Sequence, residues 1–67
     1  MTDTNLLNEK IAQAGVTKRF VAKSLNISEQ SLRSKIANKQ DFRQNEIIAI
    51  SETLRLTVSE RNRIFFA

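Results

Sequence analysis

Four side chains between residues 30 and 37 carry the groups of this sequence that are best suited to molecular recognition. The segment reads QSLRSKIA, and Gln30 and Arg33 end in planar groups that can form two parallel hydrogen bonds. Gln pairs in this way with adenine, and Arg pairs with the O6/N7 edge of guanine. Ser34 can bond a base or a phosphate, and Ala37 is small enough to meet a thymine methyl group. These residue types indicate base recognition, and the plain alternative is a solvated helix face.

The basic residues of the chain gather around this segment. Residues 17–43 hold seven basic and two acidic side chains, a net charge of +5, whereas the rest of the chain has a net charge of −1. A localised positive surface favours binding to a polyanion. Lys23 and Lys35 lie to the sides of the segment, either as further contacts or as charges that only keep the chain soluble. The candidate phosphate-binding residues are Lys18, Asn38, Lys39 and Arg43.

The composition argues against several other kinds of site. The chain has 67 residues, so we expect a single domain over residues 1–67. A domain of this size buries only about 60% of its unfolded surface, which leaves little room for an enzyme cleft. Cys and His are absent, so thiolate ligands and the commonest general base are missing. We therefore expect no catalytic residue, no metal, no cofactor and no enzymatic activity.

Membrane segments are also not expected. The longest apolar runs, such as IIAI, have four residues, which is too short for a transmembrane helix or for the core of a signal peptide. We expect a cytoplasmic protein that makes no contact with a membrane.

The spacing of apolar residues predicts that short helices position the candidate side chains. Strand signals are weak, because no run of alternating β-branched residues lies between turn residues. The first helix is expected to run from about Thr4 to Gly15, a natural helix stop. The second is expected over residues 17–25, with Thr17 as its cap. Its expected inward residues are Phe20, Val21, Ala22 and Leu25.

The third predicted helix covers about residues 28–37 and holds the candidate recognition side chains. Ser28 can cap it, and Glu29 suits its first turn because the helix dipole stabilises a negative charge there. Leu32 and Ile36, four residues apart, form its apolar stripe. The residues left pointing outward are Gln30, Arg33, Ser34 and Ala37.

A fourth helix is expected over residues 44–54. Its expected apolar set is Ile47, Ile48, Ile50 and Leu54. Phe42 and Ile47 have the spacing of a hydrophobic staple if Arg43 is the N-cap residue. The Arg side chain is a poor cap, so capping by Asp41 one turn earlier is the alternative.

The end of the chain predicts a short fifth helix, which makes five in all. Thr57 and Glu60 have the spacing of a capping box. Three consecutive residues, Ile64, Phe65 and Phe66, sweep about 200° of a helix, so one core face cannot take all of them. Either the end of the chain folds over the core, or these three residues form a homodimer patch.

The junction between the second and third helices reads LNI. Asn26 suits a left-handed corner residue, since Asn is the best substitute for Gly in that conformation. Ala22, four residues earlier, is small enough to let the two helices touch. Two short helices joined at such a corner have the spacing of a helix-turn-helix.

On these residues the chain resembles the Cro/CI repressor family of temperate phages, over roughly residues 5–56. The residues that carry this resemblance are Ala22, Asn26, Ile27, Leu32 and Ile36. The chain is also similar to the small Cro-like modulator-of-repression proteins of lactococcal phages. The residues that carry this second likeness are Leu32, Lys35, Ile36, Asn38, Lys39, Phe42, Glu46 and Ile47. Two residues depart from the family pattern, because Asn26 replaces a glycine and Arg43 stands where relatives often have Ser or Thr.

The resemblance implies a compact, all-α, five-helix domain of the lambda-repressor-like helix-turn-helix type. It implies a transcription regulator in the cytoplasm of a bacterial host, which binds double-stranded operator DNA in Cro-like control of the choice between lysis and lysogeny. It also implies homodimers that read two half-sites about one helical turn apart. The alternative that it implies is an antirepressor, which binds the cognate phage repressor protein and alters or blocks the DNA binding of that repressor.

Overall fold

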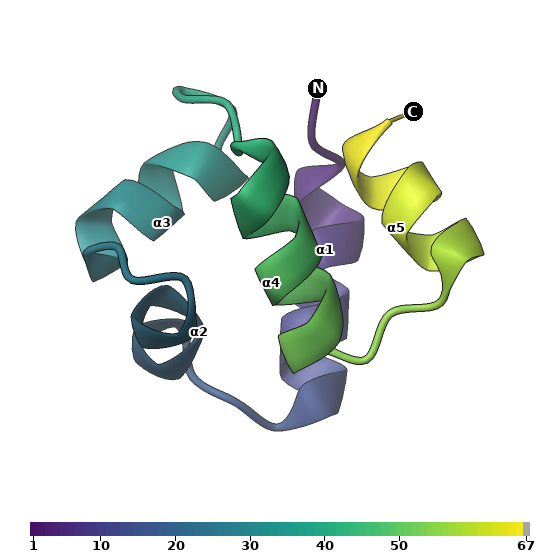
Figure 1. Cartoon of the computed structure of the whole chain (residues 1–67), viewed down its shortest axis with the longest axis horizontal. Helices are drawn as coiled ribbons and strands as arrows, with labels where there is room; N and C mark the ends of the chain where they lie inside the picture. Colours follow the sequence, from purple (N-terminus) through teal and green to yellow (C-terminus); the bar gives the residue numbers. More distant parts are fainter. Residues whose placement is uncertain (67) are drawn as a thin grey trace.

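The structure, a computed structural model, describes residues 1–66 and contains five helices and no strand within that range. The helices are α1 (Thr4–Ala14), α2 (Lys18–Ser24), α3 (Glu29–Ile36), α4 (Gln44–Thr53) and α5 (Val58–Phe65). In Figure 1, α2 and α3 lie together on one side, α5 lies on the opposite side, and α4 stands in front of α1 between them. The prediction of an all-helical chain with five short helices is confirmed.

Side-chain caps fix the starts of four helices. Thr17, Ser28 and Thr57 each accept a hydrogen bond from the backbone N–H three residues later, as predicted, and Asp3 does the same for α1. Glu60 in turn accepts a hydrogen bond from the Thr57 backbone N–H at 2.8 Å, which completes the predicted capping box. Each cap satisfies backbone groups that the helix itself leaves unpaired, so these side chains specify where the helices begin.

Three helices end in the same backbone motif. Asn26, Asn38 and Arg55 follow the ends of α2, α3 and α4, and their φ angles are 59°, 65° and 53°. In each case the next backbone N–H bonds to the carbonyl oxygen five residues earlier, at 3.0, 2.9 and 2.9 Å. This is a Schellman motif, in which Gly is the commonest left-handed residue and Asn the next choice. The prediction for Asn26 is confirmed, and α1 ends as expected at Gly15.

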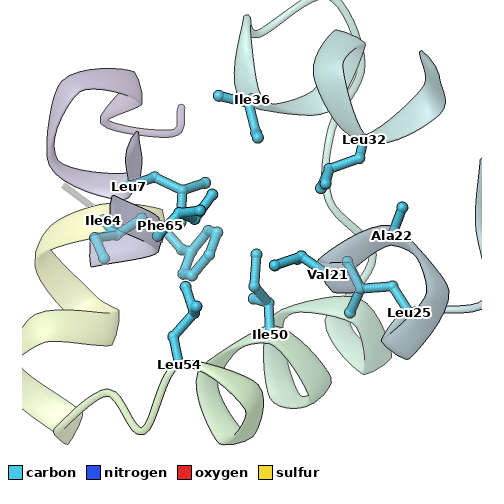
Figure 2. Close-up of a cluster of buried hydrophobic side chains, with 11 residues drawn as sticks. Leu7, Val21, Ala22, Leu25, Leu32, Ile36, Ile50, Leu54, Ile64 and Phe65 are labelled. Carbon is cyan, nitrogen blue, oxygen red and sulfur yellow. The ribbon is translucent and has the colours of Figure 1, made fainter. Parts of the chain in front are cut away.

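One hydrophobic core joins all five helices. Figure 2 shows buried side chains from different helices pointing toward a common centre. The buried apolar residues are Leu7, Ile11, Val21, Ala22, Leu25, Leu32, Ile36, Ile50, Leu54, Ile64 and Phe65. Those with no accessible surface are Leu7, Val21, Leu32, Ile50 and Ile64, one from each helix. The core is therefore complete only when every helix is in place.

Two residues that were expected to face inward are on the surface. Phe20 is 54% exposed and Ile48 is 48% exposed, so these two predictions are wrong. In α4 the buried stripe runs through Glu46, Ile50 and Leu54, at intervals of four residues. Successive residues of a helix are about 100° apart, so Ile48 lies on roughly the opposite side of α4 from that stripe. Phe20 is turned outward in the same way, because α2 buries the side that carries Val21, Ala22 and Leu25.

The end of the chain folds over the core. Ile64 and Phe65 are buried, and only Phe66 is exposed. The ring of Phe65 packs edge-on against Phe42, with centroids 5.3 Å apart and planes at 78°. The expected homodimer patch of Ile64, Phe65 and Phe66 therefore does not exist as one surface, because two of its members belong to the core.

The N-terminal segment, up to the first residue of α1, joins the ends of α3 and α5. The Asp3 backbone N–H donates to the Ile64 carbonyl oxygen at 2.7 Å, and Thr4 Oγ1 donates to the Ile36 carbonyl oxygen at 2.5 Å. These carbonyl groups lie in the last turns of their helices, where no partner exists within the helix. The N-terminal segment thus satisfies both helix ends and holds them in place.

An ion pair joins α1 to α5. Lys10 Nζ donates a hydrogen bond to Glu60 Oε2. This bond and the one from the Thr57 backbone N–H lower the pKa of the Glu60 carboxyl from 4.5 to about 2. A carboxyl group whose pKa is lower in the folded state stabilises the fold above its unfolded pKa, and this contribution is lost as the pH falls toward the folded pKa.

Truncation of the most central residue of α3 should unfold much of the population. We expect Leu32→Ala to lower the free energy of unfolding by about 2–5 kcal/mol, because it removes a fully buried side chain and leaves a cavity. Urea unfolding followed by circular dichroism measures this loss. Phe20→Ala is the control, with an expected change within about 0.5 kcal/mol for an exposed position. Equal free energies of unfolding for the two variants would contradict the assignment of Leu32 to the core.

Acid unfolding should report the Glu60 contact. As the pH falls from about 4.5 to about 2, the unfolded chain takes up a proton on Glu60 before the folded chain does, so the folded state loses stability. Glu60→Gln cannot titrate, and we expect its melting temperature to fall less than that of the wild type over the same range. Thermal melts at a series of pH values test this. If the melting temperatures of the two proteins fell equally with pH, the assigned contribution of the Glu60 carboxylate to stability would be contradicted.

Candidate nucleic-acid interface

A tight corner fixes α3 against α2. The Ile27 backbone N–H donates to the Ala22 carbonyl oxygen at 3.0 Å and folds the chain back over the end of α2. Ala22 is only 3% exposed, so the predicted small residue does lie where the two helices meet. Val21 and Leu32 are fully buried in the core that the helices share. The position of α3 relative to α2 is therefore set by this corner and by the buried side chains of both helices.

The outward face of α3 carries the residues expected to recognise bases. Gln30, Arg33 and Ala37 are exposed, and Ser34 is half-buried. Ala37 is the C-cap residue, so it stands at the very end of the helix. The structure therefore places all four residues along α3, away from its buried stripe.

Arg33 already has a partner within α3. Its Nε and Nη2 atoms donate to Glu29 Oε2 at 3.2 and 2.6 Å. The two side chains are 59% and 40% exposed, so the pair contributes only about 0.3–0.5 kcal/mol and can exchange for an outside acceptor. Because one cation faces one anion, this pair adds no net charge to the outer face of α3.

Basic side chains border both ends of α3. Near its C-terminal end, Lys18, Arg33 and Ala37 line a hollow of about 200 Å³. Near its N-terminal end, Arg19 and Lys23 line a second hollow of about 470 Å³ with the Asn26–Glu29 corner. Lys39 and Arg43 are exposed in the segment that follows α3. The structure thus brings Lys18 close to Arg33 and Ala37, two of the candidate base-reading residues.

Arg19 is a basic residue of this surface that the candidate set leaves out. It is exposed and shares a hollow with Lys23, which makes Lys23 part of the same basic surface. The sequence carries a signal for Arg19, because the residue follows Lys18 in the first turn of α2, away from the Val21–Ala22–Leu25 side.

Asn38 has a different role from the one expected. Its side-chain Oδ1 accepts from the Thr2 backbone N–H, and its Nδ2 donates to the Thr2 carbonyl oxygen, both at 2.9 Å. The amide group is therefore occupied by the N-terminal segment and is not free to contact a phosphate. Asn38 instead ends α3 through its left-handed backbone and ties the N-terminal segment to that end.

Searches of protein-family models, curated proteins and solved structures found no match to this chain. In the part of the chain that the structure describes, no helix is long and apolar enough to cross a membrane. No group of three or more acidic side chains in residues 1–66 could hold a metal ion.

Lys35 is buried, contrary to the expectation that it lies at the side of the helix. It is 6% exposed, and its Nζ donates to both carboxylate oxygens of Glu46 at 2.6 and 2.7 Å. The sequence carries a signal for this position, because Leu32, Lys35 and Ile36 are at i, i+3 and i+4 and share one helix face. The pair therefore joins the inner face of α3 to the first turn of α4.

Glu46 also caps the N-terminus of α4. Arg43 is the N-cap residue, with φ −77° and ψ 158°, so the alternative of capping by Asp41 is wrong. The Arg43 side chain has no acceptor atom, and Glu46 Oε1 instead accepts from the Arg43 backbone N–H at 2.8 Å. Phe42 and Ile47 flank this cap at staple positions, and both pack against the core.

Two opposing effects set the charge state of Glu46. Burial raises the pKa of its carboxyl group, but the hydrogen bonds from Lys35 and from the Arg43 backbone N–H outweigh burial, so the pKa lies below 4.5. Glu46 is therefore ionised at neutral pH. The contribution of this carboxylate to stability is present above the unfolded pKa and is lost in acid.

Removing one charge of the buried pair should be far more damaging than removing one charge of the exposed pair. Glu46→Gln keeps an acceptor for the Arg43 N–H but leaves the Lys35 ammonium buried without a counter-charge, and we expect a loss of about 3–5 kcal/mol. Glu29→Gln, which breaks the exposed pair with Arg33, should change stability by at most about 0.5 kcal/mol. Urea unfolding of both variants gives the comparison.

A double variant checks the physical reason. Lys35→Met combined with Glu46→Gln removes both charges, so it should regain most of the stability that Glu46→Gln alone loses. Losses of similar size for Glu46→Gln and Glu29→Gln would mean that the buried pair does not hold α3 against α4.

Proposed function

We propose that the chain is a DNA-binding transcription regulator of the Cro/CI type, in which α2 and α3 form a helix-turn-helix. The observation that carries this proposal is the division of α3 into two faces. Leu32, Lys35 and Ile36 anchor one face in the protein, and the opposite face presents Gln30 and Arg33 to the outside. A helix held in this way is suited to enter the major groove of DNA.

The charges around α3 support the same function. Glu46 neutralises Lys35, and Glu29 neutralises Arg33. The other charged side chains therefore determine the electrostatic potential around α3. The basic residues that remain between residues 17 and 43 are Lys18, Arg19, Lys23, Lys39 and Arg43, against Asp41 alone. Contacts between such residues and phosphates release counterions, which supplies affinity that does not depend on sequence.

In the proposed mechanism, one set of residues positions α3 on the DNA and another set recognises the bases. Lys18, Lys39 and Arg43 contact phosphates and set the register of α3, whereas Gln30 and Arg33 bond to base edges. Arg33 exchanges Glu29 for the O6/N7 edge of a guanine. This exchange costs little because the pair within the helix is exposed. In this role the protein acts in the cytoplasm of a bacterial host, in Cro-like control of lysis and lysogeny.

One observation favours a second candidate function. The outer face of α3 is nearly neutral, since the Arg33–Glu29 pair cancels and the neighbouring Gln30, Ser34 and Ala37 are uncharged. A neutral face of small and polar residues is also suited to contact with another protein. In that case the chain is an antirepressor, whose α3 binds the cognate phage repressor.

One pair of variants tests the DNA-binding proposal. Glu29→Gln/Arg33→Ala is compared with Glu29→Gln alone, so that no unpaired carboxylate repels the DNA. On a duplex selected from a random pool by the wild-type chain, loss of Arg33 should weaken binding by about 1–3 kcal/mol and relax the preference at one base pair. Binding to a scrambled duplex should change much less. Fluorescence anisotropy at fixed salt measures both affinities.

Lys39→Ala is the contrasting variant. It should weaken the selected and the scrambled duplex alike and reduce the slope of log K against log salt by about one unit. If the wild-type chain enriches no duplex from the random pool, the DNA-binding proposal fails. Calorimetric titration against the cognate repressor then decides whether Arg33 contributes to a protein complex instead.

A further inference from the structure

The side chain of Asn38 holds the N-terminal segment through its whole amide group. Its Oδ1 atom accepts from the Thr2 backbone N–H, and its Nδ2 atom donates to the Thr2 carbonyl oxygen, both at 2.9 Å. The Nδ2 atom also donates to Thr4 Oγ1 at 3.3 Å. We call these contacts of Asn38 with Thr2 and Thr4 the Asn38 clasp. Because the amide group uses its acceptor and its donor atom together, the clasp fixes the orientation of the Asn38 side chain.

The N-terminal side of the clasp is itself anchored at two places. The Asp3 backbone N–H donates to the Ile64 carbonyl oxygen at 2.7 Å, and Thr4 Oγ1 donates to the Ile36 carbonyl oxygen at 2.5 Å. Figure 1 shows the N-terminal end of the chain beside the C-terminal end of α5. The clasp therefore ties the end of α3 to α5.

Asn38 directly precedes Lys39, one of the proposed phosphate contacts. The Lys39 backbone N–H donates to the Ser34 carbonyl oxygen at 2.9 Å, in a motif that requires the left-handed φ of 65° at Asn38. The Lys39 side chain is exposed and takes part in none of the ion pairs within residues 1–66. The direction in which the chain carries Lys39 away from α3 is therefore set at Asn38.

The other end of the segment that joins α3 to α4 is fixed as well. Glu46 Oε1 accepts from the Arg43 backbone N–H at 2.8 Å, and the ring of Phe42 packs against Phe65. Arg43, like Lys39, is exposed. Residues 39–43 thus form a short connection that is held at both ends and carries one proposed phosphate contact at each end.

We propose that the Asn38 clasp positions Lys39 for a phosphate of the DNA backbone. Asn38 is then a positioning residue, which acts through Lys39 and makes no contact with the DNA itself. This inference rests on the proposed function. A cation that is held in place before binding loses less conformational freedom when it meets a phosphate, and each side chain that must first be ordered costs binding free energy. The N-terminal segment therefore contributes to DNA affinity from outside the interface.

Two matched substitutions of asparagine test the inference. Asn38→Gly removes the clasp but keeps the left-handed backbone, because Gly adopts positive φ angles freely. Asn26→Gly makes the same change at the equivalent left-handed position after α2, where the exposed side chain forms no hydrogen bond within residues 1–66. On the duplex selected by the wild-type chain, Asn38→Gly should bind about two- to tenfold more weakly, and Asn26→Gly should bind like the wild type. Fluorescence anisotropy measures the affinities, and circular dichroism confirms that both variants are folded.

A double variant distinguishes positioning from a general loosening of the fold. If the clasp acts through Lys39, Asn38→Gly should have no further effect on binding in the Lys39→Ala background, because the cation that the clasp positions is absent. A merely structural role would weaken binding equally in both backgrounds. Thr2→Pro attacks the clasp from its other side, since it removes the N–H that Asn38 accepts from, and it should reproduce the loss seen for Asn38→Gly.

NMR without DNA tests the clasp separately from DNA binding. The ¹⁵N heteronuclear NOE values of residues 39–41 should fall in Asn38→Gly and stay unchanged in Asn26→Gly. Unchanged values in Asn38→Gly, wild-type affinity of that variant, or additive losses in the double variant would overturn the inference and leave the proposed function standing. If the wild-type chain enriches no duplex from the random pool, the proposed function fails and the inference fails with it.

Discussion

The buried contact between Lys35 and Glu46 is the interaction on which the orientation of α3 depends. Each charge is out of water and is stable there only because the other is present, with both carboxylate oxygens bonded to the ammonium group. Apolar residues of similar volume would stabilise the fold equally well. We therefore infer that the pair fixes the orientation of α3 more than it adds to the free energy of unfolding. The carboxylate also bonds the Arg43 backbone N–H. One side chain thus fixes α3 against α4 and sets where α4 begins.

The rest of the candidate interface follows from this anchoring. With its inner face bound to α4 and to the core, α3 can present only the side that carries Gln30 and Arg33. The N-terminal segment secures the far end of the helix through Asn38 and the Ile36 carbonyl oxygen. The proposed recognition of a partner by α3 then uses the side of the molecule that lies opposite α5 (Figure 1).

The sequence predicts the local features well and the long-range ones poorly. Helix caps and the Asn26 corner depend on residues within one turn of each other, so spacing alone reveals them. Which side of a short helix faces inward depends on where the other helices lie, and both Phe20 and Ile48 were misplaced for that reason. The contact of Asn38 with Thr2 joins residues far apart in the chain, and nothing in the local pattern indicates it.

The ion pairs can be predicted from the sequence only in part. The pair of Glu29 and Arg33 follows from their spacing of four residues, and Lys35 shares a helix face with Leu32 and Ile36. The spacing therefore carries a signal that Lys35 is turned inward, although we had predicted a position at the side of the helix, and it carries no signal that Glu46 is the partner. The measurement that tests the central claim most directly is an NMR titration of the ¹⁵N-labelled chain with duplex DNA. We predict that amide signals of residues 18–19, 28–39 and 43 shift most, and that those of α5 stay in place. Unchanged spectra at DNA concentrations above about 100 µM, or shifts confined to α4 and α5, would contradict the assignment of α3 as the DNA-binding element.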